Sequence, residues 1–229
     1  MIKIENTEVF GWEAAIRGMR NPMNSWDKSD SEWCFNKKKS ESQCDEVYCD
    51  DCFSYIYEVG ENDLKLMKQL SKAGSDHSKY LRMINVTLDI TAPLYWWKEF
   101  DTYKVGTVAN SCSTMHKIHA KEFTLEDFSV EHLGEQELRE MNCIINILNR
   151  NREAFLESKA KYYWWQMIQL LPSSYNQKRT VQLNYQVLKN MYHARKNHKL
   201  DEWREFCKWI ELLPYSELII GESNEQNNQ

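Results

Sequence analysis

Apolar and polar residues alternate most regularly in the run NVTLDIT. Val86, Leu88 and Ile90 are separated by single polar residues, and this period of two is typical of a strand with one buried face. Pro93 follows, and a proline interrupts the hydrogen bonding of a sheet interior. The pattern therefore predicts one clear strand that ends near residue 93.

Apolar residues at helical spacing dominate much of the remaining chain. Asn62-Asp63 can cap a helix that stops at Gly74, and Asn21-Pro22 ends an earlier one. The chain reads as almost entirely helical from Gly134 onward, with a break at Pro172. The predicted helices are residues 11–19, 62–73, 94–103, a long segment from 134, a segment holding Val181, Leu188 and Met191, and residues 201–212.

These elements predict an α+β fold, a small and mostly antiparallel sheet packed by several long helices. We expect a single domain over residues 1–220, since 229 residues can bury one sizeable core. A polar, cysteine-rich insertion at about residues 26–55 is expected to be an irregular excursion from that fold. The tail at 221–229 has nothing to bury and is predicted to be disordered.

Composition narrows the class of protein. Hydrophobic residues make up 42% of the chain, which excludes a disordered protein, and the formal net charge is −5. This charge argues against a protein that wraps around a nucleic-acid duplex, and it is compatible with a protein that binds a small anionic ligand. Seven cysteines without an export signal or a membrane-spanning stretch indicate a cytoplasmic protein.

Three segments carry a resemblance to a known family. They read LMKQLSKAGSDHSKY at 66–80, DITAPLYWWKEFDTYKVGTVANSCSTMHK at 89–117 and LLPSSYNQKRTVQLNYQVLKNMYHAR at 170–195. Together they resemble the flavin-dependent thymidylate synthases, also called thymidylate synthase complementing proteins, of which this chain resembles a divergent member. The spacing from Pro172 to Arg195 fits the family without a gap.

The resemblance implies roles for particular residues. Arg195 falls on the essential arginine that holds the substrate nucleotide, although by position alone it could be a cation at a helix C-terminus. The residues implied to bind the cofactor are Asn184, Asn190, His77 and Lys104. The other residues implied to bind the substrate are Ser113, Asn110 and Lys98.

The chain departs from the family at the arginine residues that hold the substrate nucleotide. The family has Arg-His-Arg after the aromatic helix, where this chain has Thr102, Tyr103 and Lys104. A following Asn-Glu-x-Ser-x-Arg becomes residues 110–115 if one residue is inserted, and without the insertion Cys112 takes the serine position and Thr114 the arginine position. In both alignments the glutamate and the arginine are absent. Each lost guanidinium removes roughly 1.5–3 kcal/mol of charge-assisted contact, and lysine does not reproduce its planar fork. We therefore do not expect unaltered thymidylate synthase activity.

Two functions stay open. The first is an enzyme that resembles the family: a methyltransferase binding FAD and a dUMP-like pyrimidine nucleotide and transferring a one-carbon unit to C5, with NADPH and methylene-tetrahydrofolate as co-substrates. The resemblance also implies a homotetramer. The second is a catalytically inactive member of the fold that acts as a nucleotide-binding or interaction protein.

The insertion holds a separate candidate site. Four thiols within nineteen residues could enclose a tetrahedral structural zinc. Their spacings match no standard zinc finger, and free thiols are the alternative. The four cysteines are Cys34, Cys44, Cys49 and Cys52.

Overall fold

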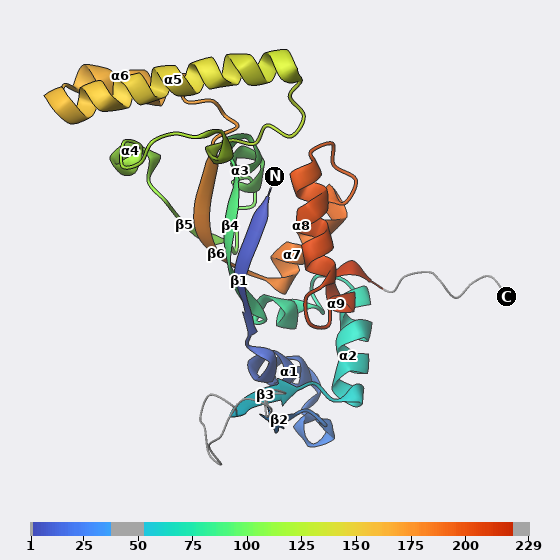
Figure 1. The fold of residues 1–229 in the computed structure, drawn as a ribbon. Coiled ribbons are helices and arrows are strands. Elements are labelled where there is room, and N and C mark those ends of the chain that lie inside the picture. The colour runs from blue at the N-terminus through green and yellow to red at the C-terminus, as the bar shows by residue number, and fades with distance from the viewer. Residues whose placement is uncertain (1, 38–52, 222–229) are drawn as a thin grey trace.

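The centre of the molecule is a four-stranded antiparallel sheet with the strand order β1-β4-β6-β5 (Figure 1). The structure is a computed structural model, and it describes residues 2–37 and 53–221. The predicted strand is β4, next to the centre of the sheet. The four strands are β1 (Lys3–Phe10), β4 (Asn85–Pro93), β6 (Asn176–Asn184) and β5 (Val108–Ser111).

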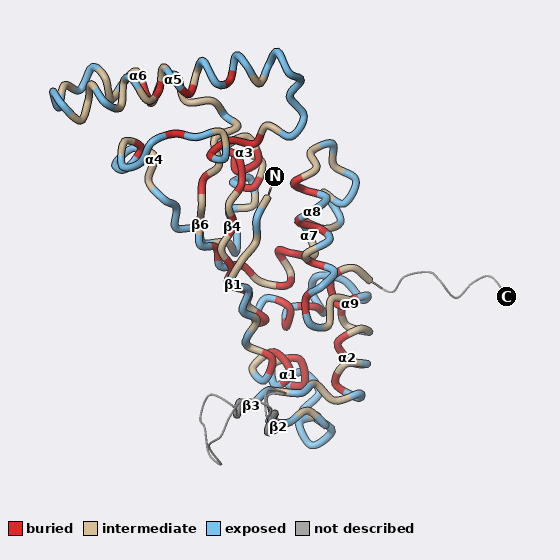
Figure 2. Tube along the Cα trace, viewed as in Figure 1, coloured by how far each residue is buried: buried red, intermediate tan, exposed pale blue. Residues whose placement is uncertain are grey.

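One face of the sheet forms the main core. Val86, Leu88 and Ile90 of β4 are at most 1% exposed, as the alternation predicts. Six helices contribute side chains to the same apolar cluster, and Figure 2 shows the buried positions concentrated there. Burying this face provides the main driving force for the fold. The six helices are α3 (Leu94–Phe100), α7 (Tyr185–Arg195) and α8 (Asp201–Glu211), together with α1 (Trp12–Arg20), α2 (Glu61–Lys72) and α9 (Glu217–Ile220).

Smaller elements extend the molecule at both ends of the sheet (Figure 1). At one end α1 and α2 pack near a two-stranded antiparallel hairpin of β2 and β3. The remaining helices are α4 (Thr114–Lys117), α5 (Glu135–Ser158) and α6 (Lys161–Leu170). Short 3-10 turns are η1 (Asn21–Met23), η2 (Trp26–Lys28), η5 (Lys79–Arg82) and η6 (Leu125–Asp127).

The helices α5 and α6 form a hairpin at the other end of the sheet. Lys159 makes the turn between them in a left-handed conformation, with φ of 55°. The hairpin has its own small core, which includes Met141, Leu148 and Met167. In the described part of the chain, no helix has both the length and the hydropathy needed to cross a membrane.

The α+β prediction is confirmed, but two local predictions were wrong. Residues 176–184 form β6 rather than the start of a helix, because Val181 and Leu183 alternate with polar residues and both face the core. The insertion is not wholly irregular, since it contributes β2 (Glu32–Lys37) and β3 (Phe53–Glu58). Residues 38–52 and 222–229 lie outside the described residues. The disorder predicted for the tail therefore stays a prediction.

The second face of the sheet is polar and carries a network around Asp89. Its carboxylate accepts hydrogen bonds from Thr180 Oγ1 (2.6 Å) and Asn6 Nδ2 (2.9 Å) and pairs with Lys178 Nζ at 3.0 Å. The hydrogen bond from Thr180, followed by those from Asn6 and Lys178, lowers the pKa of Asp89 to about 2. The network therefore stabilises the ionised carboxylate in the folded state.

Asp89→Asn should change how stability depends on pH. Because the folded pKa is depressed, the ionised carboxylate contributes stability above the unfolded pKa of about 3.9, and this contribution is lost as pH falls toward 2. We expect the free energies of unfolding of the wild type and the variant to converge over that window. Urea unfolding at a series of pH values measures this, and a difference that stays constant through the window would contradict it.

Candidate functional site

The helix α7 carries three of the residues singled out in the sequence. It begins after Asn184, whose Oδ1 accepts a hydrogen bond from the backbone N–H of Val187 at 3.1 Å. This is an ordinary N-cap contact, and it uses the side-chain oxygen of Asn184. Arg195 is the last residue of α7, about three full turns later at about 3.6 residues per turn. Asn184 and Arg195 therefore lie on the same side of the helix at its two ends.

Arg195 is fixed in a largely buried aromatic setting. Its Nε donates to Tyr103 Oη at 2.9 Å, and its Nη1 lies 2.8 Å from Glu99 Oε2. The guanidinium carbon lies 5.0 Å from the ring centroid of Trp203 and 5.5 Å from that of Tyr103. Burial disfavours its charged form, but the contacts with Tyr103 and Glu99 outweigh burial and raise the pKa of Arg195. Arg195 is thus a permanently charged, oriented group with 17% of its side chain exposed.

The segment that resembles the family's signature reaches both ends of α7. Tyr103 contacts Arg195, and Gly106 lies at the N-terminal end of the helix. Gly106 has φ of +81°, and a Cβ there would lie 3.0 Å from Val187 Cγ2 and 3.3 Å from Asn184 Nδ2. A side chain at this position would be strained, so glycine is what allows the turn to approach the helix closely.

A second guanidinium, on Arg179 of β6, lies in a similar environment. Its guanidinium carbon is 4.1 Å from the ring centroid of Trp97, and its Nε donates to Gln177 Oε1 at 3.0 Å. Its Nη1 pairs with Asp101 at 2.8 Å. Like Arg195, it is largely buried and charge-paired.

The charge balance of this region differs from that of an open anion clamp. Glu99 and Asp101, at the end of α3, neutralise the two arginines. Lys98 and Lys104 are exposed on the same segment and could meet an anion from solvent. Two carboxylates therefore lie beside residues 102–104, the positions at which the family has Arg-His-Arg.

The outer face of α7 holds a separate polar group. Gln186 Nε2 donates to Asn190 Oδ1 at 3.1 Å, and Gln186 Oε1 accepts from Ser78 Oγ at 3.2 Å. Ser78 directly follows His77, which is exposed. The structure therefore brings the turn carrying His77 close to Asn190, but on a different face of α7 from Arg195.

Asn110 and Ser113 do not join Arg195. Asn110 lies on β5 opposite Thr180, which places it on the polar face of the sheet, away from α7. Ser113 caps α4, accepting from the backbone N–H of His116 at 3.0 Å. Asn110 is thus on the other side of the sheet from α7, and Ser113 lies at the start of α4 with no contact to Arg195 among the described interactions.

The metal prediction falls mainly outside the described residues. Cys34 is a half-buried free thiol on β2, and Cys44, Cys49 and Cys52 lie in the undescribed segment. Within residues 2–37 and 53–221, no group of three or more His, Cys, Asp or Glu side chains could hold a metal ion. Structural zinc stays a prediction.

Sequence reasoning missed the partners of the arginines. Tyr103 was identified only as a departure from the family, and no role beside Arg195 was predicted for Glu99, Arg179 or Trp203. A signal was present, since Glu99 and Asp101 lie immediately before the altered residues 102–104. Acidic residues next to lost arginines can indicate a changed charge balance.

The comparisons with known proteins concern the fold. No protein-family model matches the sequence, and no curated protein matches it. The flavin-dependent thymidylate synthase ThyX from Helicobacter pylori, complexed with FAD and dUMP, superposes with a TM-score of 0.62 at 16% identity, over 94% of this chain and 96% of that chain. The UMP/dUMP methylase PolB from Streptomyces cacaoi, bound with 5-Br dUMP, gives a TM-score of 0.57 at 13% identity, over 94% and 93%.

Both matches span nearly the full length of each chain, so they concern the whole architecture. Identities this low establish a shared fold and not a shared activity. The chain therefore has the fold of the flavin-dependent thymidylate synthases.

Proposed function

We propose that the chain binds FAD and a dUMP-like pyrimidine nucleotide, with Arg195 as the ligand of the phosphate. The observation that carries the proposal is the setting of Arg195, a guanidinium held between Tyr103 and Trp203 at the end of α7. A guanidinium is suited to bidentate recognition of phosphate. The FAD, dUMP and 5-Br dUMP bound to the structural neighbours support this choice of ligands.

Nucleotide binding at this site requires a change of partner. Glu99 occupies one edge of the Arg195 guanidinium, and a phosphate has to replace that carboxylate or bind beside it. Lys98 and Lys104, both exposed, would add positive charge. Their ammonium groups lack the planar, bidentate hydrogen-bonding geometry of a guanidinium. Ser113 and Asn110 would join the site only from another copy of the chain.

The residues proposed for the flavin fit it in part. Asn190 and the turn with His77 present an amide and an imidazole near one face of α7, and the amide nitrogen of Asn184 lies beside Gly106. When bound, reduced flavin supplies the hydride for one-carbon transfer to C5, with NADPH and methylene-tetrahydrofolate as co-substrates. In this chain the proposed role of Asn184, Asn190 and His77 is to bind and orient the ring.

A homotetramer is part of the proposal. Large apolar side chains of α6 are exposed, including Tyr162 (66%), Leu170 (46%) and Trp165 (42%). Exposed aromatic residues of this kind are typical of subunit interfaces. A reducing cytoplasm suits the free thiols of Cys112 and Cys143, which are exposed.

A second candidate function has its own support. Arg195 and Arg179 are both paired with carboxylates of the chain, and the Arg-His-Arg residues are replaced. Such a site is suited to a catalytically inactive protein of this fold, which binds a nucleotide or a protein partner without chemistry. The two candidates differ in whether the flavin is reactive.

The visible absorption spectrum of the purified protein tests the proposal. We expect FAD to bind near one equivalent per chain, dUMP to perturb the flavin band, and light scattering to give a tetramer. A colourless protein with no change on adding FAD would overturn the flavin proposal. Flavin binding without dTMP formation, measured by mass spectrometry with both co-substrates present, would favour the inactive protein.

A further inference from the structure

A large pocket lies between the β2–β3 hairpin and the rest of the molecule. Its volume is about 750 Å³, which falls in the usual range for small-molecule sites. The end of β1, the start of α1, the hairpin and residues 214–215 form its walls. None of the residues proposed above to bind flavin or nucleotide lines it. The aromatic residues that line it are Phe10, Trp12, Trp33, Tyr57 and Tyr215.

The rings of the pocket meet in two near-perpendicular pairs. Trp33 and Tyr57 of the hairpin have centroids 5.3 Å apart with an interplanar angle of 72°. Trp12 and Tyr215 are 5.0 Å apart at 69°. In each pair the edge of one ring contacts the face of the other, so the two pairs form continuous aromatic walls. Trp33 is 57% exposed and Phe10 is 44% exposed, so part of this surface is open to an incoming ligand.

Among the residues that the structure describes, the charged side chains lining the pocket are acidic. They are Glu13 and Glu58, and no lysine, arginine or histidine of residues 2–37 and 53–221 lines it. Glu13 Oε2 accepts a hydrogen bond from Trp33 Nε1 at 3.3 Å, which ties the carboxylate to an aromatic wall. Arg17, outside the lining, lies 3.9 Å from Glu13 Oε1 as an exposed pair, and such pairs are weak.

Aromatic walls with carboxylates are suited to an organic cation. The faces of Trp and Tyr rings attract a cation through their quadrupole, and ammonium ligands with methyl groups also gain from apolar contact. An anion would be repelled by Glu13 and Glu58, and a metal ion would lack a third carboxylate ligand in the lining.

We propose that this pocket binds a small quaternary ammonium compound. The aromatic residues contact the methylated head, and Glu13, which is hydrogen-bonded to Trp33, is its nearest counter-charge, with Glu58 adding to the negative charge of the lining. The inference goes beyond the proposed function, because it concerns other residues and a ligand of opposite charge. It stands whether or not the chain binds flavin.

Binding of choline, compared with its neutral isostere 3,3-dimethylbutan-1-ol, tests the proposal. The full-length protein labelled with 5-fluorotryptophan is titrated at constant ionic strength, with Trp33→Phe assigning the Trp33 resonance in the ¹⁹F spectrum. We expect a saturable shift of the Trp33 signal by choline and about three- to thirtyfold weaker binding of the neutral compound. Equal affinity for both compounds, or no saturable shift, would overturn the proposal.

Two pocket variants and two controls sharpen the test. The double variant Glu13→Gln/Glu58→Gln keeps the shape and removes the charge, and it should weaken choline binding without affecting the neutral isostere. Trp33→Leu should weaken choline binding, and its circular dichroism verifies folding. Glu205→Gln and Trp165→Leu change exposed residues elsewhere and should bind choline as the wild type does. Unchanged binding in both pocket variants would overturn the assignment.

Discussion

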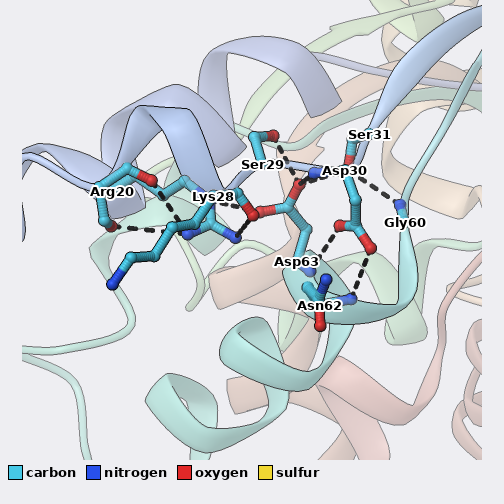
Figure 3. Close-up of polar contacts among 9 residues, drawn as sticks. Arg20, Lys28, Ser29, Asp30, Ser31, Gly60, Asn62 and Asp63 are labelled. Carbon is cyan, nitrogen blue, oxygen red and sulfur yellow. Dashed lines mark hydrogen bonds and ion pairs between the residues drawn. The ribbon is translucent and has the colours of Figure 1, made fainter.

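Asp63→Asn should lower the free energy of unfolding by about 3–5 kcal/mol. Asp63 is fully buried on α2 and accepts Arg20 Nε at 2.6 Å (Figure 3). It also accepts the hydroxyls of Ser29 at 2.7 Å and Ser31 at 2.6 Å, and the backbone N–H of Asp30 at 3.2 Å. Removing the carboxylate charge leaves the buried guanidinium without its counter-ion. An uncompensated buried charge strongly destabilises the folded state.

The network also joins the start of the insertion to the body of the molecule. Arg20, only 5% exposed, donates to the carbonyl oxygens of Ser25 and Lys28 at 3.2 and 3.0 Å. Asp30 accepts hydrogen bonds from the backbone N–H groups of Asn62 and Asp63 at the start of α2. These contacts link residues 25–31 to α2 in both directions. We therefore expect the Asp63→Asn variant to lose order in this segment first.

Urea unfolding of the variant at neutral pH measures the effect. Asp201→Asn is the matched control, since Asp201 also pairs with an arginine but is 45% exposed, and it should cost less than about 1 kcal/mol. The double variant Arg20→Met/Asp63→Leu should recover part of the loss, because it removes both charges but leaves the hydroxyls of Ser29 and Ser31 without their acceptor. A loss below about 1 kcal/mol for Asp63→Asn would contradict a stabilising role for this pair.

The sign of the pH dependence follows from the same contacts. Burial by itself raises the pKa of Asp63, but the hydrogen bonds from Ser29, Ser31 and Arg20 outweigh it and hold the pKa below its ordinary value. The stabilisation is therefore present above the pKa of the unfolded carboxyl and is lost as pH falls below it. The difference between wild type and Asp63→Asn should shrink in acid.

Periodicity predicted the elements whose pattern is local. β4 alternates without interruption, and α8 keeps Trp203, Phe206 and Ile210 on one buried face. β1 was missed because its pairing with β4 shifts register between Glu5 and Glu8, which breaks the period of two. β6 was missed because its alternation runs directly into α7, so the strand and the helix read as one segment.

The place of Arg195 at the end of a helix was predictable from the sequence, but the charges around it were not. The gap-free spacing from Pro172 located Arg195 at the end of a helix, where the structure also has it. Its partners come from separate segments: Glu99 and Tyr103 lie more than ninety residues earlier in the sequence, and Trp203 lies on the next helix. A single sequence shows no contact between distant residues, so the neutralisation of Arg195 became visible only in the fold.

Glu99→Gln should raise the affinity of the protein for dUMP by roughly tenfold. The carboxylate now lies 2.8 Å from Arg195 Nη1, and it would both occupy the guanidinium and repel an incoming phosphate. Glutamine keeps the length of the side chain but removes the charge, so Arg195 becomes available while Tyr103 and Trp203 still hold it. Isothermal titration at low and moderate salt measures the change, which should be smaller at higher salt because the charges are screened.

Two further variants show whether the gain acts through Arg195. Adding Arg195→Lys to Glu99→Gln should abolish most of the gain, because an ammonium cannot form the bidentate contact. Glu205→Gln removes a carboxylate that pairs with Lys208 on α8, and it should leave dUMP affinity unchanged, which excludes a general effect of net charge. If Glu99→Gln leaves dUMP affinity unchanged while FAD still binds, Arg195 is not the phosphate ligand, and the ion pair with Glu99 is a structural contact that holds α3 to α7.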